Sequence, residues 1–327
     1  MTRVVKRLAP YVAVVWAAIT LNFLIPHLAP GDPIDLFSGE ANSLTAEERD
    51  RLRADYALDG SLVDQYGRMW GRLARGDLGT SVRHSRPVAH VLADRLPWTL
   101  ALVGSATAVS TAIGVLAAAF AARRRGRRRD LFCVAGLMAL DSMPAFWIGM
   151  VLVAAFAVHL GWLPSFGAVP LDAAGTVAGA LVEMGRRLVL PVASLVLATV
   201  GTTFLLARGA MVTALDAPYV QLAEAAGLPP RRIVYRHALR NALLPVSTHL
   251  AVTVGTLLSG AVVVETVFAY PGLGRVTFEA VQARDYALLQ GAFLMVTAAV
   301  VVANALADLV YPLLDPRVRR ASMVEPA

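Results

Sequence analysis

Six long apolar runs restrict the folds that are open to this sequence. Each carries at most one Asp, Glu, Lys or Arg and reaches the ~20 residues that a helix needs to cross ~30 Å of hydrocarbon. Because hydrocarbon cannot hydrogen-bond to the backbone, each run must satisfy its own amides and carbonyls as a helix. We therefore expect an all-α membrane protein with six transmembrane helices, at residues 8–31, 97–122, 131–163, 188–207, 241–264 and 286–307. A further apolar run at 173–182 is too short to cross.

Basic residues are distributed unevenly around these runs. With the N-terminus inside, the four cytoplasmic segments carry 17 Lys and Arg residues and the two short outer loops carry four, which are Arg186, Arg187, Arg275 and Arg284. This enrichment predicts a cell-membrane protein with both termini in the cytoplasm. The six arginines within 123–129 are interpreted as a topology signal that can also contact anionic lipid. Since this pattern accounts for the net charge of +7, we expect a lipid membrane, and no nucleic acid, as a partner.

The spacing of the runs predicts four parts. They are a cytoplasmic N-terminus with the first transmembrane helix at 1–29, a small external domain at 30–96, a five-helix core with a cytoplasmic loop (213–245) at 97–314, and a cytoplasmic tail at 315–327. In the external domain, Thr45 and Glu48 have the spacing of a capping box. A second helical stripe runs from Leu62 to Leu73 and ends at Gly76.

A polar, arginine-bearing stretch at 219–245 separates the fourth and fifth runs. Asp216 is a good N-cap for a short helix, with Pro218 in its first turn. Gly227 would follow the helix end, where a left-handed conformation costs glycine least. The proline pair at 229–230 would then begin a second helix. We expect two short helices that meet at a glycine elbow.

Small residues in this stretch, Ala223, Ala225 and Ala226, would let the elbow approach another protein closely. The plain alternative is an ordinary basic loop that obeys the positive-inside rule. Geometry alone does not decide between these two interpretations.

The same stretch resembles the cytoplasmic coupling loop of ATP-binding-cassette (ABC) importer permeases, in the form found in the peptide and nickel branch. Counted back from Gly227, the Glu-Ala-Ala triplet of the wider superfamily falls on residues 221–223, where only the last alanine matches; residues 224–226 spell it in the wrong register. The ending His-Ala-Leu-Arg-Asn-Ala-Leu-Leu-Pro at 237–245 is that of the peptide branch. The resemblance implies contact with an ATPase through Gln221, Leu222, Ala223, Ala226, Gly227, Leu228 and Arg231.

Other motifs similar to that branch occur in the expected order along nearly the whole chain, at residues 23–33, 75–81, 263–275, 284–286 and 314–317. They imply the first permease subunit type of a dipeptide or oligopeptide importer. The implied partners are a second homologous permease, two cytoplasmic ATP-binding subunits and an external solute-binding protein. The implied mechanism is alternating access driven by those ATPases. The same machine could import nickel chelates or another small solute.

Three acidic residues lie in or beside the apolar runs: Asp141, Glu265 and Asp308. Charges there are costly and usually face a bundle interior, a cavity or a partner. Asp141 precedes a predicted helix break at Ser142-Met143-Pro144 and is the candidate for lining a translocation pathway. Glu265 and Asp308 are expected to be solvated at the membrane interface. An ion-coupled secondary transporter, the second hypothesis, would need several deep charges.

Small residues at four-residue spacing form two rows in the second run: Gly104, Ala108 and Ala112, and Gly114, Ala118 and Ala122. Such rows let membrane helices approach closely. They can serve packing within the bundle or a seam with a second permease, and the sequence leaves both open.

No enzymatic constellation is found in the sequence. The single lysine, Lys6, follows Val5 and cannot complete a phosphate-binding Gly-Lys-Ser/Thr loop. The single cysteine, Cys133, permits no intrachain disulfide and no cysteine metal cluster. We expect no enzyme activity, cofactor or metal in this chain, and ATP hydrolysis in partner subunits.

The orientation is testable with reporter fusions. The positive-inside distribution predicts external readings at Gly79 and Gly274 and cytoplasmic readings at Gly126 and Pro229. Paired alkaline phosphatase and fluorescent-protein fusions at each site provide the measurement. A cytoplasmic reading at Gly79 would reverse the orientation.

Overall fold

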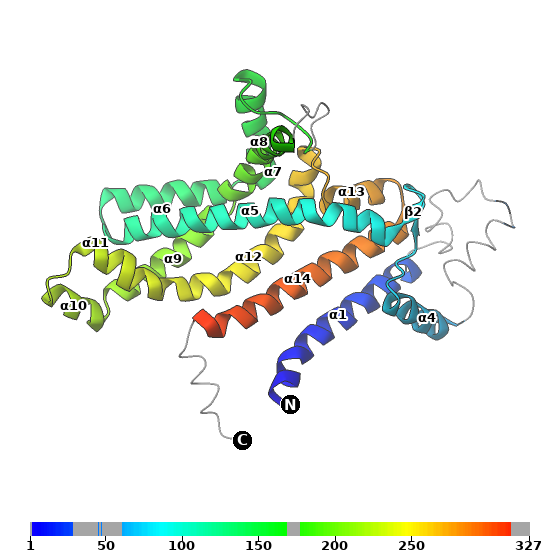
Figure 1. Ribbon diagram of the computed structural model, residues 1–327, viewed down its shortest axis with the longest axis horizontal. Helices are drawn as coiled ribbons and strands as arrows, with labels where there is room; N and C mark the ends of the chain where they lie inside the picture. The colour runs from blue at the N-terminus through cyan, green and yellow to red at the C-terminus, as the bar shows by residue number, and fades with distance from the viewer. Residues whose placement is uncertain (1, 29–44, 46, 48–60, 169–176, 315–327) are drawn as a thin grey trace. The chain divides into compact units, whose positions relative to one another are not determined.

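The computed structural model describes residues 2–28, 45, 47, 61–168 and 177–314, and nearly all of this described chain is helical (Figure 1). The expected capping box at Thr45 and Glu48, the tail at 315–327 and the side chain of Asp308 lie outside the described residues. The elements are α1 Thr2–Leu28, α4 Leu62–Ala74, β1 Thr80–Ser81, β2 Arg86–Pro87, α5 Val88–Ala122, α6 Arg128–Asp141, α7 Ala145–Leu152, η1 Val153–His159, α8 Val177–Leu197, α9 Val200–Leu215, α10 Pro218–Ala225, α11 Pro230–Arg232, η2 Ile233–Ala238, α12 Leu239–Val267, α13 Leu273–Gln282 and α14 Tyr286–Leu314.

The described helices confirm an all-α membrane fold. Within the described residues, α5 and α14 are each long and apolar enough to cross a membrane, and two bent pairs raise the number to four if each pair is one span. Residues 9–24 of α1 form a shorter apolar helix. The count of six spans stays a prediction.

The sequence predicted the first of the two bends but not the second. The first, of 96°, separates α6 from α7 at residues 142–144, where Pro144 was expected to break the helix. The second, of 52°, separates α8 from α9, and the expectation of one unbroken run at 188–207 was wrong there. No proline marks this second break, because Pro191 lies inside α8.

Arg186 and Arg187, which composition assigns to an outer loop, lie inside α8, and their external position stays a prediction. Their guanidinium groups bind Glu183 one turn earlier, at 3.5 and 3.1 Å. Arg186 also donates to the carbonyl oxygen of Trp162, and Arg187 to that of Phe166. Local ion pairing lets α8 extend through a charged segment that composition assigns to a loop.

The chain forms two compact units, and the first comprises residues 1–100 and 271–302. Its core is formed by the beginnings of α5 and α14 with α13, through Val88, Val91, Leu92, Leu273, Val276, Ala280, Ala287, Leu288 and Ala292. In the same unit, α1 binds α14 through a reciprocal pair, since the amides of Asn22 and Gln290 each donate to the other's backbone carbonyl at 2.9 Å.

Helix α4 confirms the second helix predicted between the first two apolar runs, and its external position stays a prediction. It begins at Ser61, which exchanges hydrogen bonds with Asp64 in a full capping box, and these bonds hold the pKa of the Asp64 carboxyl below its usual range. The helix ends at Arg75, and Gly76 follows with φ +74°. Tyr66 fixes α4 to α1, because its hydroxyl lies 2.7 Å from that of Thr20.

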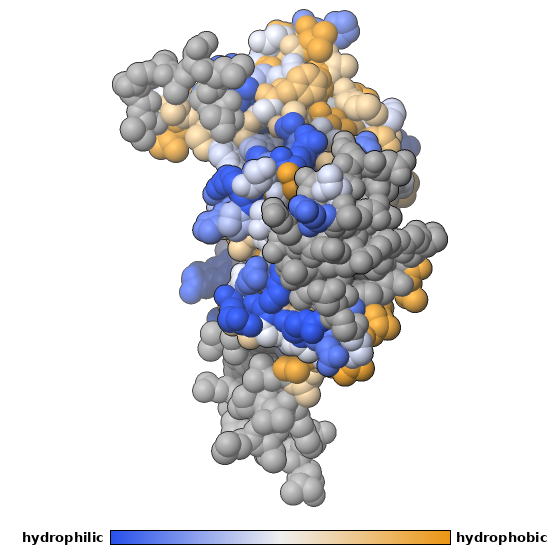
Figure 2. All heavy atoms as spheres, turned by 90° about the vertical axis from the view of Figure 1, so that its right-hand side faces the viewer, coloured by the Kyte–Doolittle hydropathy of each residue, from blue (hydrophilic) through white to orange (hydrophobic). Residues whose placement is uncertain are grey.

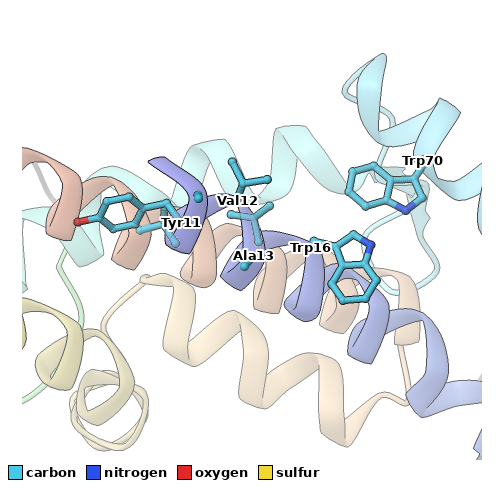
Figure 3. Close-up of a pocket in the computed structure, with 8 residues that line it drawn as sticks. Tyr11, Val12, Ala13, Trp16 and Trp70 are labelled. Atoms are coloured by element: carbon cyan, nitrogen blue, oxygen red, sulfur yellow. The ribbon is translucent and has the colours of Figure 1, made fainter. Parts of the chain in front are cut away.

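Unit 1 carries contrasting surfaces. An apolar hollow of about 830 Å³ lies among residues of α1, α4 and α14, including Tyr11, Trp16 and Trp70 (Figure 3). Its almost purely apolar lining suits contact with lipid chains rather than water.

The end of unit 1 with β2 and α4 faces the viewer in Figure 2, where hydrophilic residues gather. Arg83 and Arg86 are exposed in this unit.

Unit 2 comprises residues 101–270 and 303–327, and α9 is its central helix. Small residues let neighbouring helices approach α9. A Cβ on Gly114 of α5 would lie 3.0 Å from the Thr203 side chain, and one on Gly201 of α9 would lie 2.5 Å from the Leu137 carbonyl oxygen of α6. The contact at Gly201 leaves no room for a larger residue, and the contact at Gly114 is tight, so α5 and α6 pack closely against α9.

The two rows of small residues on α5 have different environments. Gly114, Ala118 and Ala122 are buried within unit 2. Gly104, Ala108 and Ala112 are exposed. The first row therefore serves packing within the bundle, whereas the second remains available to a partner or to lipid.

Asp285 is a buried acidic residue of unit 1 whose hydrogen bonds join separate segments. Its replacement tests how much these bonds stabilise the fold. Its carboxylate, in a residue 1% exposed, accepts from Ser81 Oγ at 2.6 Å, Arg83 N at 3.1 Å and Leu288 N at 3.0 Å. Asp285→Ala should lower the free energy of unfolding by about 2–4 kcal/mol, because it removes a helix cap and leaves a buried hydroxyl without its acceptor. Thermal unfolding in detergent micelles measures the effect.

The matched control is Asp94→Ala, which removes an exposed ion pair with Arg86 at 3.1 Å. Such a pair contributes about 0–1 kcal/mol. Equal shifts in the two variants would contradict the role assigned to Asp285.

Candidate functional site

The candidate site is the elbow formed by α10, Gly227 and α11, which we call the coupling elbow. It is entered from α9, which ends at Leu215 with Asp216 as its C-terminal cap. The expectation that Asp216 caps the following helix was wrong, because Ala217 occupies that position without a side-chain bond. The Asp216 carboxylate instead binds Arg125 at 3.0 Å.

The end of α10 confirms the glycine elbow. The Gly227 amide donates to Glu224 O at 2.9 Å and the Leu228 amide donates to Ala223 O at 3.2 Å. This pair of bonds is a Schellman motif, which needs a left-handed residue just past the helix. Gly227 has φ +75°, and a Cβ there would meet nothing within 4 Å. Backbone conformation, not space, is therefore what selects glycine.

A small apolar core holds the elbow closed. Val220, Ala223 and Ile233 are buried together, and Leu228 packs against them. The contact between Leu228 and Ala223 is the apolar contact that commonly accompanies a Schellman motif. Ala223 is only 8% exposed, so its small side chain serves the interior of the elbow in this chain.

The outer surface of the elbow differs from its core. Leu222 is 73% exposed, although it is a large apolar residue at the elbow. Five neighbouring residues are also exposed: Gln221, Glu224, Ala225, Ala226 and Arg231. An exposed leucine beside small residues is suited to bind a groove on another protein. The arrangement brings together no catalytic groups.

The elbow is continuous with the helices of unit 2. Pro230 begins α11, which passes through the π-helical segment η2 directly into α12. Val234 and Ala238 of η2 are buried against Met211 and Ala214 of α9 and against Ala119 of α5. A force on the elbow would therefore act directly on three helices. The sequence analysis did not predict η2, and π-helical segments are rare in proteins.

A second anchor, which sequence reasoning missed, lies where α6 meets α9. Arg208 binds Asp130 through two bonds, Nε to Oδ1 at 2.7 Å and Nη2 to Oδ2 at 2.6 Å. Gly126 N also donates to Asp130 at 3.0 Å, and Asp130 is 3% exposed. This bidentate geometry is the strong form of an ion pair. One available signal was an acid directly after an arginine cluster.

Asp141 ends α6 at the first bend. Its Oδ2 accepts from Thr202 Oγ1 at 2.7 Å, whereas its Oδ1 is buried without a hydrogen-bond partner in the described chain. A buried carboxylate oxygen normally has a partner, so this atom can accept a bond from water or a ligand. Asp141 lies at the end of α6, whereas the elbow is formed by α10 and α11, so the structure places the two features on different elements.

Glu265 does not lie where it was expected. It is fully buried in α12, with 0% exposure, and the expectation of interfacial solvation was wrong. The chain turns back after α12, so that Tyr270 N donates to Glu265 O at 2.8 Å. Burial, with the nearby Glu265 charge as a second cause, raises the pKa of Tyr270 to about 12. The phenol therefore stays protonated throughout the physiological range.

Comparison with known proteins places this chain in a family. Residues 111–320 match the family described as binding-protein-dependent transport system inner membrane component. The di/tripeptide transport system permease protein DppB of Pseudomonas aeruginosa is 35% identical, over 97% of this chain and 98% of its own length. The dipeptide transport system permease protein DppB of Escherichia coli K12 is 34% identical with the same coverage.

A structural comparison agrees at the level of the fold. An inward-facing structure of the MetNI methionine ABC transporter matches with a TM-score of 0.54 and 16% identity, covering 69% of this chain and 96% of that one. The matched family segment contains the coupling elbow and Asp141. The chain belongs to the family of binding-protein-dependent transport system inner membrane components.

Proposed function

We propose that this chain forms part of the translocation pathway of an ABC importer of di- and oligopeptides. The names of relatives at 34–36% identity across 97% of the chain support a peptide substrate. Membership of a binding-protein-dependent family supports an external solute-binding protein and ATP-hydrolysing partners. The chain itself acts as a permease, and nickel chelates or other small solutes are the alternative cargo.

The proposed assembly pairs this chain with a second homologous permease and two cytoplasmic ATP-binding subunits. The exposed row Gly104, Ala108 and Ala112 on α5 supports a permease partner, because small residues allow close helix contact in lipid. The cytoplasmic orientation of the elbow is supported by the 17 basic residues assigned to the inner segments.

The observation that carries the proposal is the construction of the coupling elbow. A left-handed glycine and a closed apolar core make the elbow rigid, and exposed Leu222 gives it a contact surface. Continuity from α11 through η2 into α12 lets motion of an ATPase move the bundle. Alternating access by such rigid-body movement needs no chemistry on the substrate.

Asp141 is proposed as a polar contact on the pathway. It lies at a helix break, where backbone groups are freed only inside protein or beside water. Its unpartnered Oδ1 is able to accept a hydrogen bond from the ammonium group of a peptide. The neighbouring Thr202 hydroxyl holds the other carboxylate oxygen in place.

Gly227→Val tests the elbow through its backbone. A β-branched residue at φ +75° is strained by roughly 1–3 kcal/mol, so the elbow should open and ATP hydrolysis should lose its stimulation by loaded binding protein. Gly227→Asn is the matched control, since asparagine tolerates this conformation best among larger residues. The measurement is ATPase activity of the reconstituted complex. Wild-type stimulation of ATP hydrolysis in Gly227→Val would contradict the assignment of this elbow as the contact with the ATPase.

Leu222→Glu tests the surface of the same elbow. It should weaken association of the ATPase subunit, because a carboxylate would replace the 73% exposed leucine at the contact. Glu224→Ala is the control and should change little, since in the family register Glu224 is not the motif glutamate. Co-purification of the ATPase subunit gives the comparison. A stronger defect in Glu224→Ala would show that the register is wrong.

Asp141→Asn tests the pathway. Peptide uptake into proteoliposomes should fall by about tenfold or more, the effect of losing a charge-assisted hydrogen bond worth ~1.5–3 kcal/mol. Assembly and yield should stay near wild type, because the amide can still accept from Thr202. Asp94→Asn, on an exposed ion pair, is the control. Loss of assembled complex in Asp141→Asn would instead assign the carboxylate a structural role.

A further inference from the structure

We propose that unit 2 carries a binding site for the phosphate of an anionic phospholipid headgroup. The site is a pocket of about 340 Å³ lined by Phe120, Arg123, Arg124, Arg231 and Tyr235. We call it the arginine pocket. It lies between the C-terminal end of α5 and the segment formed by α11 and η2.

The charge of the arginine pocket selects an anion. Three of its five lining residues are arginines and none is acidic. Two acids near the pocket in sequence pair with other arginines, since Asp216 binds Arg125 at 3.0 Å and Asp130 binds Arg208 at 2.6 Å. A third, Glu224, is exposed on α10 and does not line the pocket. The positive charge of the pocket therefore lacks a carboxylate partner within its own lining, and an external anion can supply one.

The side chain of Arg124 is held in place and, within the described chain, has a free hydrogen-bond donor for such a ligand. Its guanidinium carbon lies 4.8 Å from the centre of the Phe120 ring, a cation–π contact that fixes the group against the pocket wall. Its Nη1 is buried and has no hydrogen-bond partner in the described chain. A buried charged donor without an acceptor is costly, and a phosphate oxygen in the pocket would satisfy it.

The position of the pocket favours a lipid headgroup over a free ion. The apolar run of α5 ends at Ala122, and Arg123 and Arg124 follow at once. These guanidinium groups consequently lie where a bilayer changes from hydrocarbon to headgroups. Two half-exposed aromatic residues, Phe120 at 42% and Tyr235 at 44%, border the site and suit the glycerol and upper acyl region.

An occupied pocket would connect the membrane surface to the base of the coupling elbow. Arg231 and Tyr235 lie on the segment that continues the elbow into α12. A bound headgroup would thus restrain that segment relative to the end of α5. This consequence rests on the proposed function, whereas the binding site itself does not.

The experiment measures phospholipid retained by the full-length chain in its permease–ATPase complex. The complex is equilibrated in detergent with equal amounts of phosphatidylglycerol and phosphatidylcholine, and bound lipid is counted by native mass spectrometry. The wild type should retain phosphatidylglycerol in preference. Arg124→Gln and Arg231→Gln should each reduce that preference about fivefold, the effect of one basic residue worth ~1 kcal/mol at an anionic surface.

The matched control is Arg128→Gln, which removes the same charge from an exposed position of the cluster that does not line the pocket. It should leave the preference nearly unchanged, and Arg124→Lys should restore part of it. Arg231 is exposed, so Arg231→Gln keeps the test valid if Arg124→Gln fails to fold. An equal loss in Arg128→Gln would show nonspecific attraction and overturn the site.

Competition separates the possible ligands. Inorganic phosphate at millimolar concentration should displace little phosphatidylglycerol, because it lacks the glycerol and acyl contacts. Full displacement by phosphate would overturn the lipid assignment in favour of a free anion. Unchanged lipid retention in both glutamine variants, together with weaker ATPase association, would overturn it in favour of a protein contact. The binding readout needs no transport, so it stays independent of the proposed cargo.

Discussion

Every backbone amide and carbonyl that enters a bilayer must find its partner within the protein or in enclosed water, because hydrocarbon offers none. Helices satisfy this requirement, yet unit 2 interrupts them twice. Side-chain hydroxyls assist at both interruptions. Ser142 Oγ donates to Met138 O at 2.8 Å at the first bend, and Thr199 Oγ1 donates to Leu195 O at 2.8 Å at the second. These bonds make the bends tolerable and so allow Asp141 to occupy a helix end within the bundle.

Helix α9 connects the features on which the function depends. Its first turn carries Gly201 and Thr202, which contact Asp141. Arg208, near its middle, holds Asp130 at the beginning of α6, and its last turn leads into the elbow. A helix of 16 residues is about 24 Å long, so one rigid element reaches from the candidate pathway contact to the candidate ATPase contact. Movement of the elbow would reach Asp141 through the two-residue link 216–217 and then along this one helix.

The sequence predicted the features whose causes are local. Gly227 and its neighbouring prolines specify an elbow through backbone conformation alone, and Pro144 specifies the first bend, so both expectations were confirmed. Expectations failed where tertiary contacts decide. Asp216 has cap propensity, but α9 continues up to it and Arg125 binds its carboxylate. Glu265 lies at the end of an apolar run, yet the following turn buries it.

At the candidate site too, the sequence predicted local features and missed those that depend on tertiary contacts. The resemblance selected the elbow, but no sequence pattern separates exposed Leu222 from buried Ala223 on a helix of eight residues. That distinction depends on Ile233 and Leu228, which fold back from the next segment. The Asp130–Arg208 pair joins residues 78 positions apart, and the break between α8 and α9 has no proline to announce it. Such long-range choices require the packed structure.

The arginines at 123–129 show how one compositional signal can serve several physical purposes. Counted together they orient the chain in the membrane, and for that purpose any of them could be replaced by lysine. Individually they are not equivalent. Arg125 binds the C-terminal cap of α9, while Arg124 lies on the Phe120 ring with a buried, unpartnered nitrogen. A planar guanidinium suits both stacking and directed hydrogen bonds, whereas a lysine ammonium would supply only a point charge. The preference for arginine at position 124 therefore follows from local contacts that a topology signal alone would not require.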